Sequence, residues 1–174
     1  MKSLLFYFID LCLLKARPQD LPASPVVLWL ILPLNVLVGV ALVGNTFGGL
    51  DKAMLAAMLD MVLLLLWVWL LLAFKRHPGR FTQSATALLG STTLVGVLLI
   101  PLQLLVGDGS DVGPLAAMAG TLLFLLMIWL LVMVTYIFRH TLEVGIALAF
   151  GLALTYFVVT NVIIRSLFPE AGAQ

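Results

Sequence analysis

The chain contains five apolar runs that are each long enough to cross a lipid bilayer. A helix rises about 1.5 Å per residue, so some 20 apolar residues span a hydrocarbon core of about 30 Å. Hydrophobic residues make up 63% of the 174 residues and charged residues only 10%, against about a quarter in soluble domains. We therefore predict an all-α membrane protein in a single membrane domain, with five transmembrane helices at about residues 26–43, 53–74, 84–106, 115–138 and 144–164.

A basic loop between the second and third runs sets the predicted orientation. Lys75, Arg76 and Arg80 surround a helix-breaking Pro78-Gly79 pair, and cytoplasmic loops of membrane proteins carry an excess of Lys and Arg. With this loop inside, seven of the nine cations lie in cytoplasmic segments and two lie outside. The amino end is therefore predicted to be cytoplasmic and the carboxyl end to be outside. The seven are Lys2, Lys15, Arg17, Lys75, Arg76, Arg80 and Arg139, and the two are Lys52 and Arg165.

Residues 3–16 predict an additional, interfacial helix. They are apolar except for a narrow stripe of Ser3, Tyr7 and Asp10 that continues to Arg17. About 14 residues rise only about 21 Å, which is too short to span the bilayer, so the helix is expected to lie along the inner leaflet. A signal peptide is the alternative, but Asp10 interrupts its apolar core. We expect Asp10 to contact Arg17 or the basic loop and so hold the helix against the bundle.

Four polar residues fall in the outer half of the predicted spans. Asp60, Gln103, Asn161 and Arg165 lie at similar depth, and a carboxylate there must face other helices and find a partner. One interpretation is a proton or ion site. The other, which the residues favour, is a structural ion pair between the second and fifth spans, because Asn35 is the one other polar group near mid-membrane.

Neither a metal site, a catalytic centre nor a nucleic-acid surface is predicted. His77, His140 and Glu143 fall on one side of the membrane, but zinc needs three or four ligands of fixed geometry. We interpret Glu143 as a first-turn acid of the fifth span near Arg139 or Lys75, after a turn at residues 139–141. No nucleophile is paired with a base, no glycine-rich phosphate loop is present, and the net charge is only +1. A non-enzymatic protein without cofactors is therefore expected.

Small residues recur at the spacing that lets helices approach closely. Packing within one bundle is the first interpretation, and a homodimer through one of these stripes is the second. The stripes are Ala147, Gly151 and Thr155 in the fifth span, Ala116 and Gly120 in the fourth, and Ala87 and Ser91 in the third.

Several segments together resemble the Yip family of five-span membrane proteins, in its short form without a long soluble amino-terminal region. They are Leu13-Leu14-Lys15-Ala16-Arg17-Pro18 after the first helix, Gly79-Arg80-Phe81-Thr82-Gln83 before the third span, and residues 126–129 in a span that ends at Arg139. Eukaryotic members of the family act in vesicle traffic through small GTPases of the Rab type. For the short form, the resemblance implies a bacterial inner membrane and contacts with lipids or other membrane proteins.

A small transporter or channel subunit is the alternative function. It rests on Asp60 and Arg165 and on a similarity between residues 63–77 and 125–140, each a leucine run with one tryptophan or more that ends in Arg-His. Transporters are often built from such duplicated segments.

Overall fold

The computed structural model describes residues 4–44, 46–47, 49–107 and 113–168, and it confirms the predicted helical fold. Five helices are long and apolar enough to cross a membrane. They are α2 (Pro25–Val43), α3 (Leu50–Phe74), α4 (Phe81–Val106), α5 (Pro114–Leu142) and α6 (Ile146–Leu167). A shorter helix, α1 (Leu4–Cys12), precedes them, and two single 3₁₀ turns, η1 (Pro18–Asp20) and η2 (Pro78–Arg80), lie in the connections.

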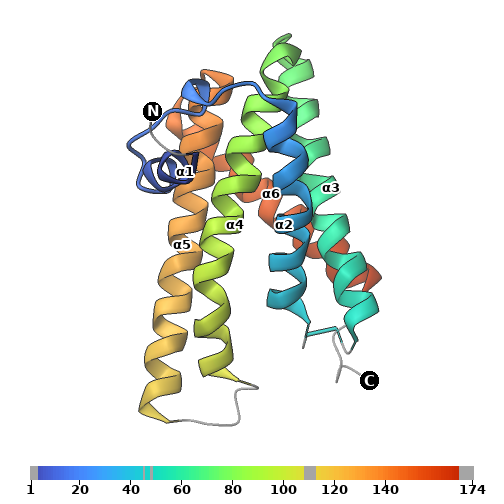
Figure 1. Ribbon diagram of the computed structural model, residues 1–174, viewed down its shortest axis with the longest axis vertical. Helices are drawn as coiled ribbons and strands as arrows, with labels where there is room; N and C mark the ends of the chain where they lie inside the picture. Colours follow the sequence, from blue (N-terminus) through green and yellow to red (C-terminus); the bar gives the residue numbers. More distant parts are fainter. Residues whose placement is uncertain (1–3, 45, 48, 108–112, 169–174) are drawn as a thin grey trace.

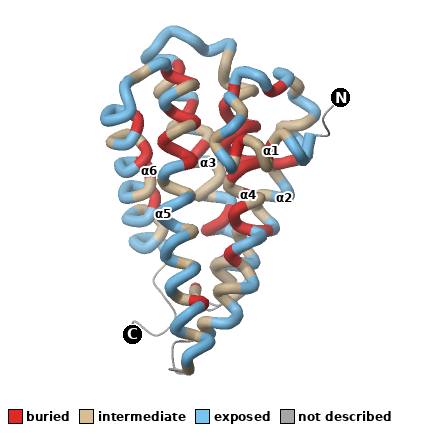
Figure 2. Tube along the Cα trace, turned by 90° about the vertical axis from the view of Figure 1, so that its left-hand side faces the viewer, coloured by how far each residue is buried: buried red, intermediate tan, exposed pale blue. Residues whose placement is uncertain are grey.

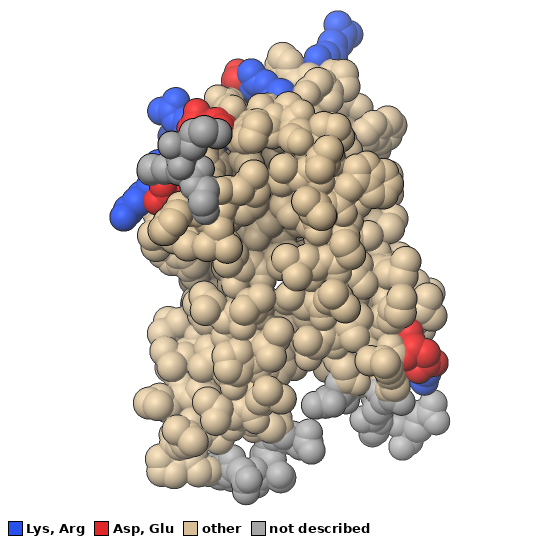
Figure 3. All heavy atoms as spheres, in the orientation of Figure 1, with Lys and Arg blue, Asp and Glu red and all other residues tan. Residues whose placement is uncertain are grey.

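Consecutive long helices run in opposite directions, as their short connections require. In Figure 1 the helices α2 to α5 lie along the long axis of the molecule, and α6 leans across behind them. We call the end with residues 75–80 the basic end and the opposite end the far end. Figure 3 shows most of the visible Lys and Arg side chains at or near the basic end.

Helix α4 forms the centre of the bundle. It contacts α2 and α5 most extensively and also touches α1 and α3. In the apolar stretch of 18 residues that could cross the membrane, 39% of the residues of α4 are buried, against 11% to 28% for the other long helices. Ala87 and Ser91 are fully buried, which confirms the prediction that this stripe packs inside the bundle. Small side chains let neighbouring backbones approach closely, and in a membrane this contact is the main source of helix association.

Helix α2 is held against α3 and α4 by small residues and one polar contact. A Cβ atom added to Gly39 would lie 3.0 Å from the Cβ of Ala57 on α3, and one added to Gly96 on α4 would lie 2.6 Å from Val38. Asn35 donates from Nδ2 to the Thr93 hydroxyl at 3.0 Å. The one polar side chain in the middle of α2 is therefore satisfied inside the bundle, as the absence of water there requires.

Helix α1 lies across α4 and α5 in the basic half. Figure 1 shows α1 nearly end-on, and Figure 2 shows it from the side. Phe8 and Leu11, on the side of α1 that faces the bundle, are buried. The Phe8 ring lies so close to Gly90 of α4 that a Cβ atom added to this glycine would lie 2.2 Å from a ring carbon. Leu5 and Phe6 on the opposite side are about 60% exposed. The buried side and the exposed side of α1 thus both carry apolar residues, and its position along the membrane interface stays a prediction.

Hydrogen bonds also tie the first segment to the bundle. Trp129 on α5 donates from Nε1 to the Cys12 carbonyl at 3.1 Å, and the Cys12 thiol lies 3.8 Å from the Ser91 carbonyl of α4. The Tyr7 hydroxyl donates to the Arg17 carbonyl. Burial, together with the negative charge of Asp20, raises the pKa of Tyr7 to about 12, so this donor stays protonated at neutral pH. The contact of Asp10 with the basic loop remains a prediction.

Two expectations about α5 and α6 are wrong. The predicted turn at residues 139–141 is helical, because none of these residues breaks a helix; α5 ends at Leu142, where Glu143 takes a left-handed conformation (φ 52°). The stripe of Ala147, Gly151 and Thr155 does not pack inside the bundle: Ala147 and Thr155 are exposed and Gly151 is half-buried. The buried face of α6 is formed by Ala149, Ala153, Tyr156 and Thr160.

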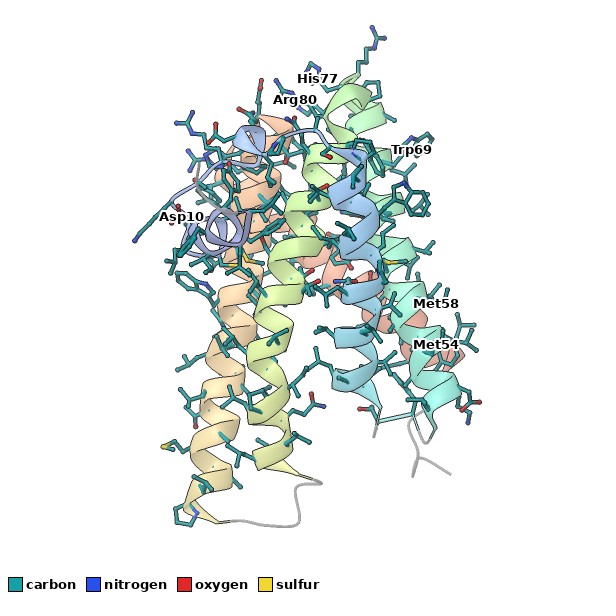
Figure 4. All side chains as sticks on the ribbon, viewed as in Figure 1. Asp10, Met54, Met58, Trp69, His77 and Arg80 are labelled. Carbon is teal, nitrogen blue, oxygen red and sulfur yellow. The ribbon has the colours of Figure 1, made fainter. Side chains whose placement is uncertain are left out.

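The outer sides of the helices are apolar. Met54, Met58 and Trp69 of α3 point away from the bundle in Figure 4 and are between 42% and 52% exposed. Trp29 of α2 is 72% exposed. A soluble protein would not leave such a surface in water, whereas a membrane protein leaves it against lipid.

Candidate functional site: a cavity around Asp60

The five long helices surround a cavity of about 610 Å³ in the far half of the bundle. Its hollow is visible in the lower half of the face shown in Figure 3. It lies on the far-end side of the contact between Gly96 of α4 and Val38 of α2. The residues that line it include Gly39 and Leu42 of α2, Ala57 and Asp60 of α3, Leu99 and Gln103 of α4, Leu123 and Met127 of α5, and Tyr156, Thr160, Asn161 and Arg165 of α6.

All four residues of the predicted polar cluster line this single cavity. Asp60 lies ten residues into α3, about 15 Å from its first residue at the far end. Gln103, Asn161 and Arg165 lie closer to the far ends of α4 and α6. The fold thus brings together side chains that are up to 105 positions apart in the sequence, from Asp60 to Arg165.

The polar contact of Asp60 across to α6 is with Tyr156. The Tyr156 hydroxyl donates to Oδ1 of Asp60 at 3.3 Å, which is long for a hydrogen bond between oxygens. Tyr156 is 6% exposed, and its ring lies 6.4 Å from that of Trp67 on α3, centroid to centroid. Asp60 itself is partly exposed because the cavity reaches it.

Tyr156 was not among the predicted site residues, although the sequence carries a signal for it. Tyr156, Thr160, Asn161 and Arg165 follow one another at spacings of four, one and four residues, so they share one side of a helix. All four line the cavity. The prediction considered charged and amide side chains, and it passed over a tyrosine within an apolar run.

The other polar groups of the cavity bind within the protein. Gln103 donates from Nε2 to the backbone carbonyl of Leu42 at 2.6 Å, and Arg165 donates from Nε to Oδ1 of the Asn161 side chain at 3.3 Å. Asp60 has one long hydrogen bond among the described residues, and a carboxylate has about four acceptor positions. Asp60 is therefore the acceptor in this cavity with the most remaining capacity for a ligand.

Most of the remaining wall is apolar. Leu42, Leu99, Val106, Leu123 and Met127 all line the cavity. Binding sites for small molecules commonly have this composition, with volumes of about 300 to 1,000 Å³ and a few polar groups that orient the ligand.

The basic loop forms a separate feature at the other end of the molecule. Arg80 and Glu143 make an ion pair with Nη1 and Oε1 2.6 Å apart, which joins the α3–α4 connection to the α5–α6 connection. The hydrogen bond and charge of Arg80 lower the pKa of Glu143. Glu143 lies between α5 and α6, so it is not the expected first-turn acid of α6; the expected nearness to Lys75 is confirmed, because the charge of Lys75 also lowers the pKa of Glu143. Lys75 directly follows the last residue of α3, Phe74, and Arg76 has a left-handed backbone (φ 59°).

No group of three or more His, Cys, Asp or Glu side chains that could hold a metal ion occurs among the described residues. No protein-family model matches the chain, and neither a curated protein nor a solved structure is significantly similar to it.

Proposed function

We propose that this membrane protein is a non-enzymatic binding or transport protein for a small organic cation, with Asp60 as the counter-charge. The observation that carries the proposal is the position of Asp60: a carboxylate with one long hydrogen bond that faces a largely apolar cavity of about 610 Å³. A charged side chain in a transmembrane helix costs about 2.5 to 3.5 kcal/mol at the span centre, so it marks a functional site unless a partner compensates it.

The position of the cavity and the close packing of the basic half favour entry of a ligand from the far end alone. The cavity is lined by residues at the far ends of α4 and α6, such as Gly107 and Arg165. Towards the basic end the space between the helices is filled by buried side chains, among them Leu64, Leu88 and Met133. A ligand would enter from the far end, and transport would require the basic half to open.

Uptake into liposomes tests the proposal. The purified protein would be reconstituted, and uptake of radiolabelled methylammonium and the movement of protons, followed with a pH-sensitive dye, would be measured. Asp60→Asn should lower uptake at least about tenfold, because the neutral amide cannot balance a cation. Asp51→Asn is the matched control, since Asp51 is an exposed carboxylate on the same helix and does not line the cavity. Equal uptake by parent and Asp60→Asn would overturn the proposal.

We further propose a bacterial inner membrane with the basic end in the cytoplasm. Among the described residues, Lys15, Arg17, Lys75, Arg76, Arg80 and Arg139 lie in segments at or near the basic end, whereas Lys52 and Arg165 lie in helices at the far end. This asymmetry follows the positive-inside rule. In a Cys12→Ser background, Gly79→Cys should react with an impermeant thiol reagent from the cytoplasm alone and Asp51→Cys from the outside alone; the reverse pattern would invert the assignment.

A membrane-organising scaffold of the Yip type is the second candidate function. It is supported by the small-residue stripe of α6, which faces outward and could take another membrane protein or a second copy of the chain. Gly151→Leu should then reduce the partners recovered by cross-linking in native membranes. The uptake of methylammonium by the same variant should not change, which separates the two functions.

A further inference from the structure

We propose that a groove between α5 and α6 at the basic end binds one acyl chain of an anionic phospholipid, whose phosphate pairs with Arg139. The groove has a volume of about 410 Å³ and lies apart from the cavity around Asp60. The residues that line it include Leu14, Val132, Tyr136, Arg139, Ala147 and Phe150.

The groove has the shape of a channel along α5. Val132, Tyr136 and Arg139 recur at intervals of four and three residues, so they follow one side of the helix over about 10 Å. Ala147 and Phe150 of α6 form the opposite wall. The small side chain of Ala147 leaves room between the helices, and its exposed position opens the groove sideways.

The cationic end of the groove is formed by Arg139. This residue lies in the last turn of α5 and is exposed. No hydrogen bond or ion pair of its guanidinium occurs among the described residues, while the nearby Glu143 is engaged by Arg80. An arginine near the end of a membrane helix extends towards the headgroups, and its planar guanidinium binds a phosphate through two hydrogen bonds.

The segment after α1 borders the groove. Leu14 lines the groove, and Lys15 follows it directly. Gln19 donates from Nε2 to the His140 carbonyl at 3.0 Å, which holds this segment against the end of α5. The groove thus pairs an apolar channel with the Arg139 guanidinium at one end, and an anionic phospholipid has the complementary arrangement of acyl chain and phosphate.

Native mass spectrometry of the whole protein in mild detergent tests this site. Phosphatidylglycerol and phosphatidylcholine with identical acyl chains would be added at equal concentrations. The parent should retain more phosphatidylglycerol, and Arg139→Gln should weaken its retention about fivefold. Arg76→Gln is the matched control, because it removes a cation from the basic end without touching the groove. Unchanged retention in Arg139→Gln, or an equal loss in Arg76→Gln, would overturn the site.

A second variant tests the channel separately from the charge. Ala147→Leu should fill the groove and lower the retention of both lipids, and the fold should persist because Ala147 is exposed. If this variant instead lost a dimer and kept its lipid, a second copy of the chain would be the occupant and the lipid proposal would be wrong.

Discussion

The basic half and the far half of the bundle use the same helices but pack them differently. In the basic half, α1 crosses α4 and α5, and Leu88, Met133 and Phe138 are buried beneath and beside it. Figure 2 shows many of the buried residues in this half and mostly exposed residues along the far half of α5. In the far half, Leu104 and Leu105 of α4 are 70% and 48% exposed, and the cavity occupies the space between the helices.

The difference shows what closes a helix bundle in a membrane. Lipid tails are as apolar as leucine, so burying a leucine side chain gains little hydrophobic free energy, and close contact between helices must supply the stability. Such contact occurs where α4 carries Ala85, Ala87, Gly90 and Ser91, of which the Ala and Ser residues are no more than 1% exposed. Beyond Gly96, α4 carries mainly leucines, and the helices can remain apart.

Replacement of a leucine by alanine is expected to show the largest difference in stability between the two halves. Leu88→Ala should lower the free energy of unfolding by about 2 kcal/mol or more, because Leu88 is fully buried and its loss leaves a void. Leu123→Ala should cost about 1 kcal/mol or less, since Leu123 borders an existing cavity. Thermal unfolding in detergent measures both. Similar losses would mean that the two halves are packed equally well.

Two glycine substitutions, Gly90→Leu and Gly151→Leu, test whether the packing of α1 against α4 stabilises the protein. Gly90→Leu should destabilise the protein by about 1 to 3 kcal/mol and displace α1, because its side chain would collide with the Phe8 ring. Gly151→Leu should have little effect on stability, since a Cβ atom there meets nothing within 4 Å. Limited proteolysis after α1, alongside thermal unfolding, distinguishes them. Resistance of the Gly90→Leu variant to protease would contradict the packing of α1.

Replacement of Asp60 separates a functional carboxylate from a structural one. Asp60→Leu should raise the free energy of unfolding by about 1 to 2 kcal/mol, because it removes a charge from the bundle and loses only a long hydrogen bond. Thermal unfolding of this variant is compared with that of Asp51→Leu. A loss of stability in Asp60→Leu would favour the structural role.

The smallest expected effect concerns the ion pair at the basic end. Arg80 lowers the pKa of Glu143, so the pair stabilises the folded state above the ordinary glutamate pKa of about 4.3, and this contribution is lost as the pH falls through the lowered value. Glu143→Gln should therefore lower the melting temperature slightly at pH 7 and not at pH 3. Arg76→Gln should show no such dependence; a constant difference for Glu143→Gln at both pH values would exclude the pair as its cause.

Several parts of the fold could be predicted because they depend on local properties. The five spans follow from the lengths of the apolar runs. The turn between α5 and α6 was misplaced because Arg139 and His140 are polar, and polarity marks the edge of a membrane better than the end of a helix. His140 instead continues the helix, with Nδ1 2.9 Å from the Tyr136 carbonyl.

The candidate site was predictable in part for the same reason. Asp60, Gln103, Asn161 and Arg165 stand out because polar residues are costly in a membrane wherever the helices pack. Tyr156 did not stand out, and neither did the groove beside Arg139. Both depend on which side of α6 faces the bundle, and small residues on two sides of that helix made the sequence ambiguous.

The sequence by itself therefore determined that the chain crosses a membrane five times and that its cations gather at one end, because hydropathy and charge act residue by residue along the chain. Tertiary structure alone decided that α1 packs over Gly90, that the stripe of Ala147, Gly151 and Thr155 faces outward, and that Asp60 meets Tyr156 in an open cavity. The reason is that lipid surrounds every side of these helices with an equally apolar medium. Hydrophobicity then cannot choose the buried side, and the detailed fit of side chains between helices must choose it.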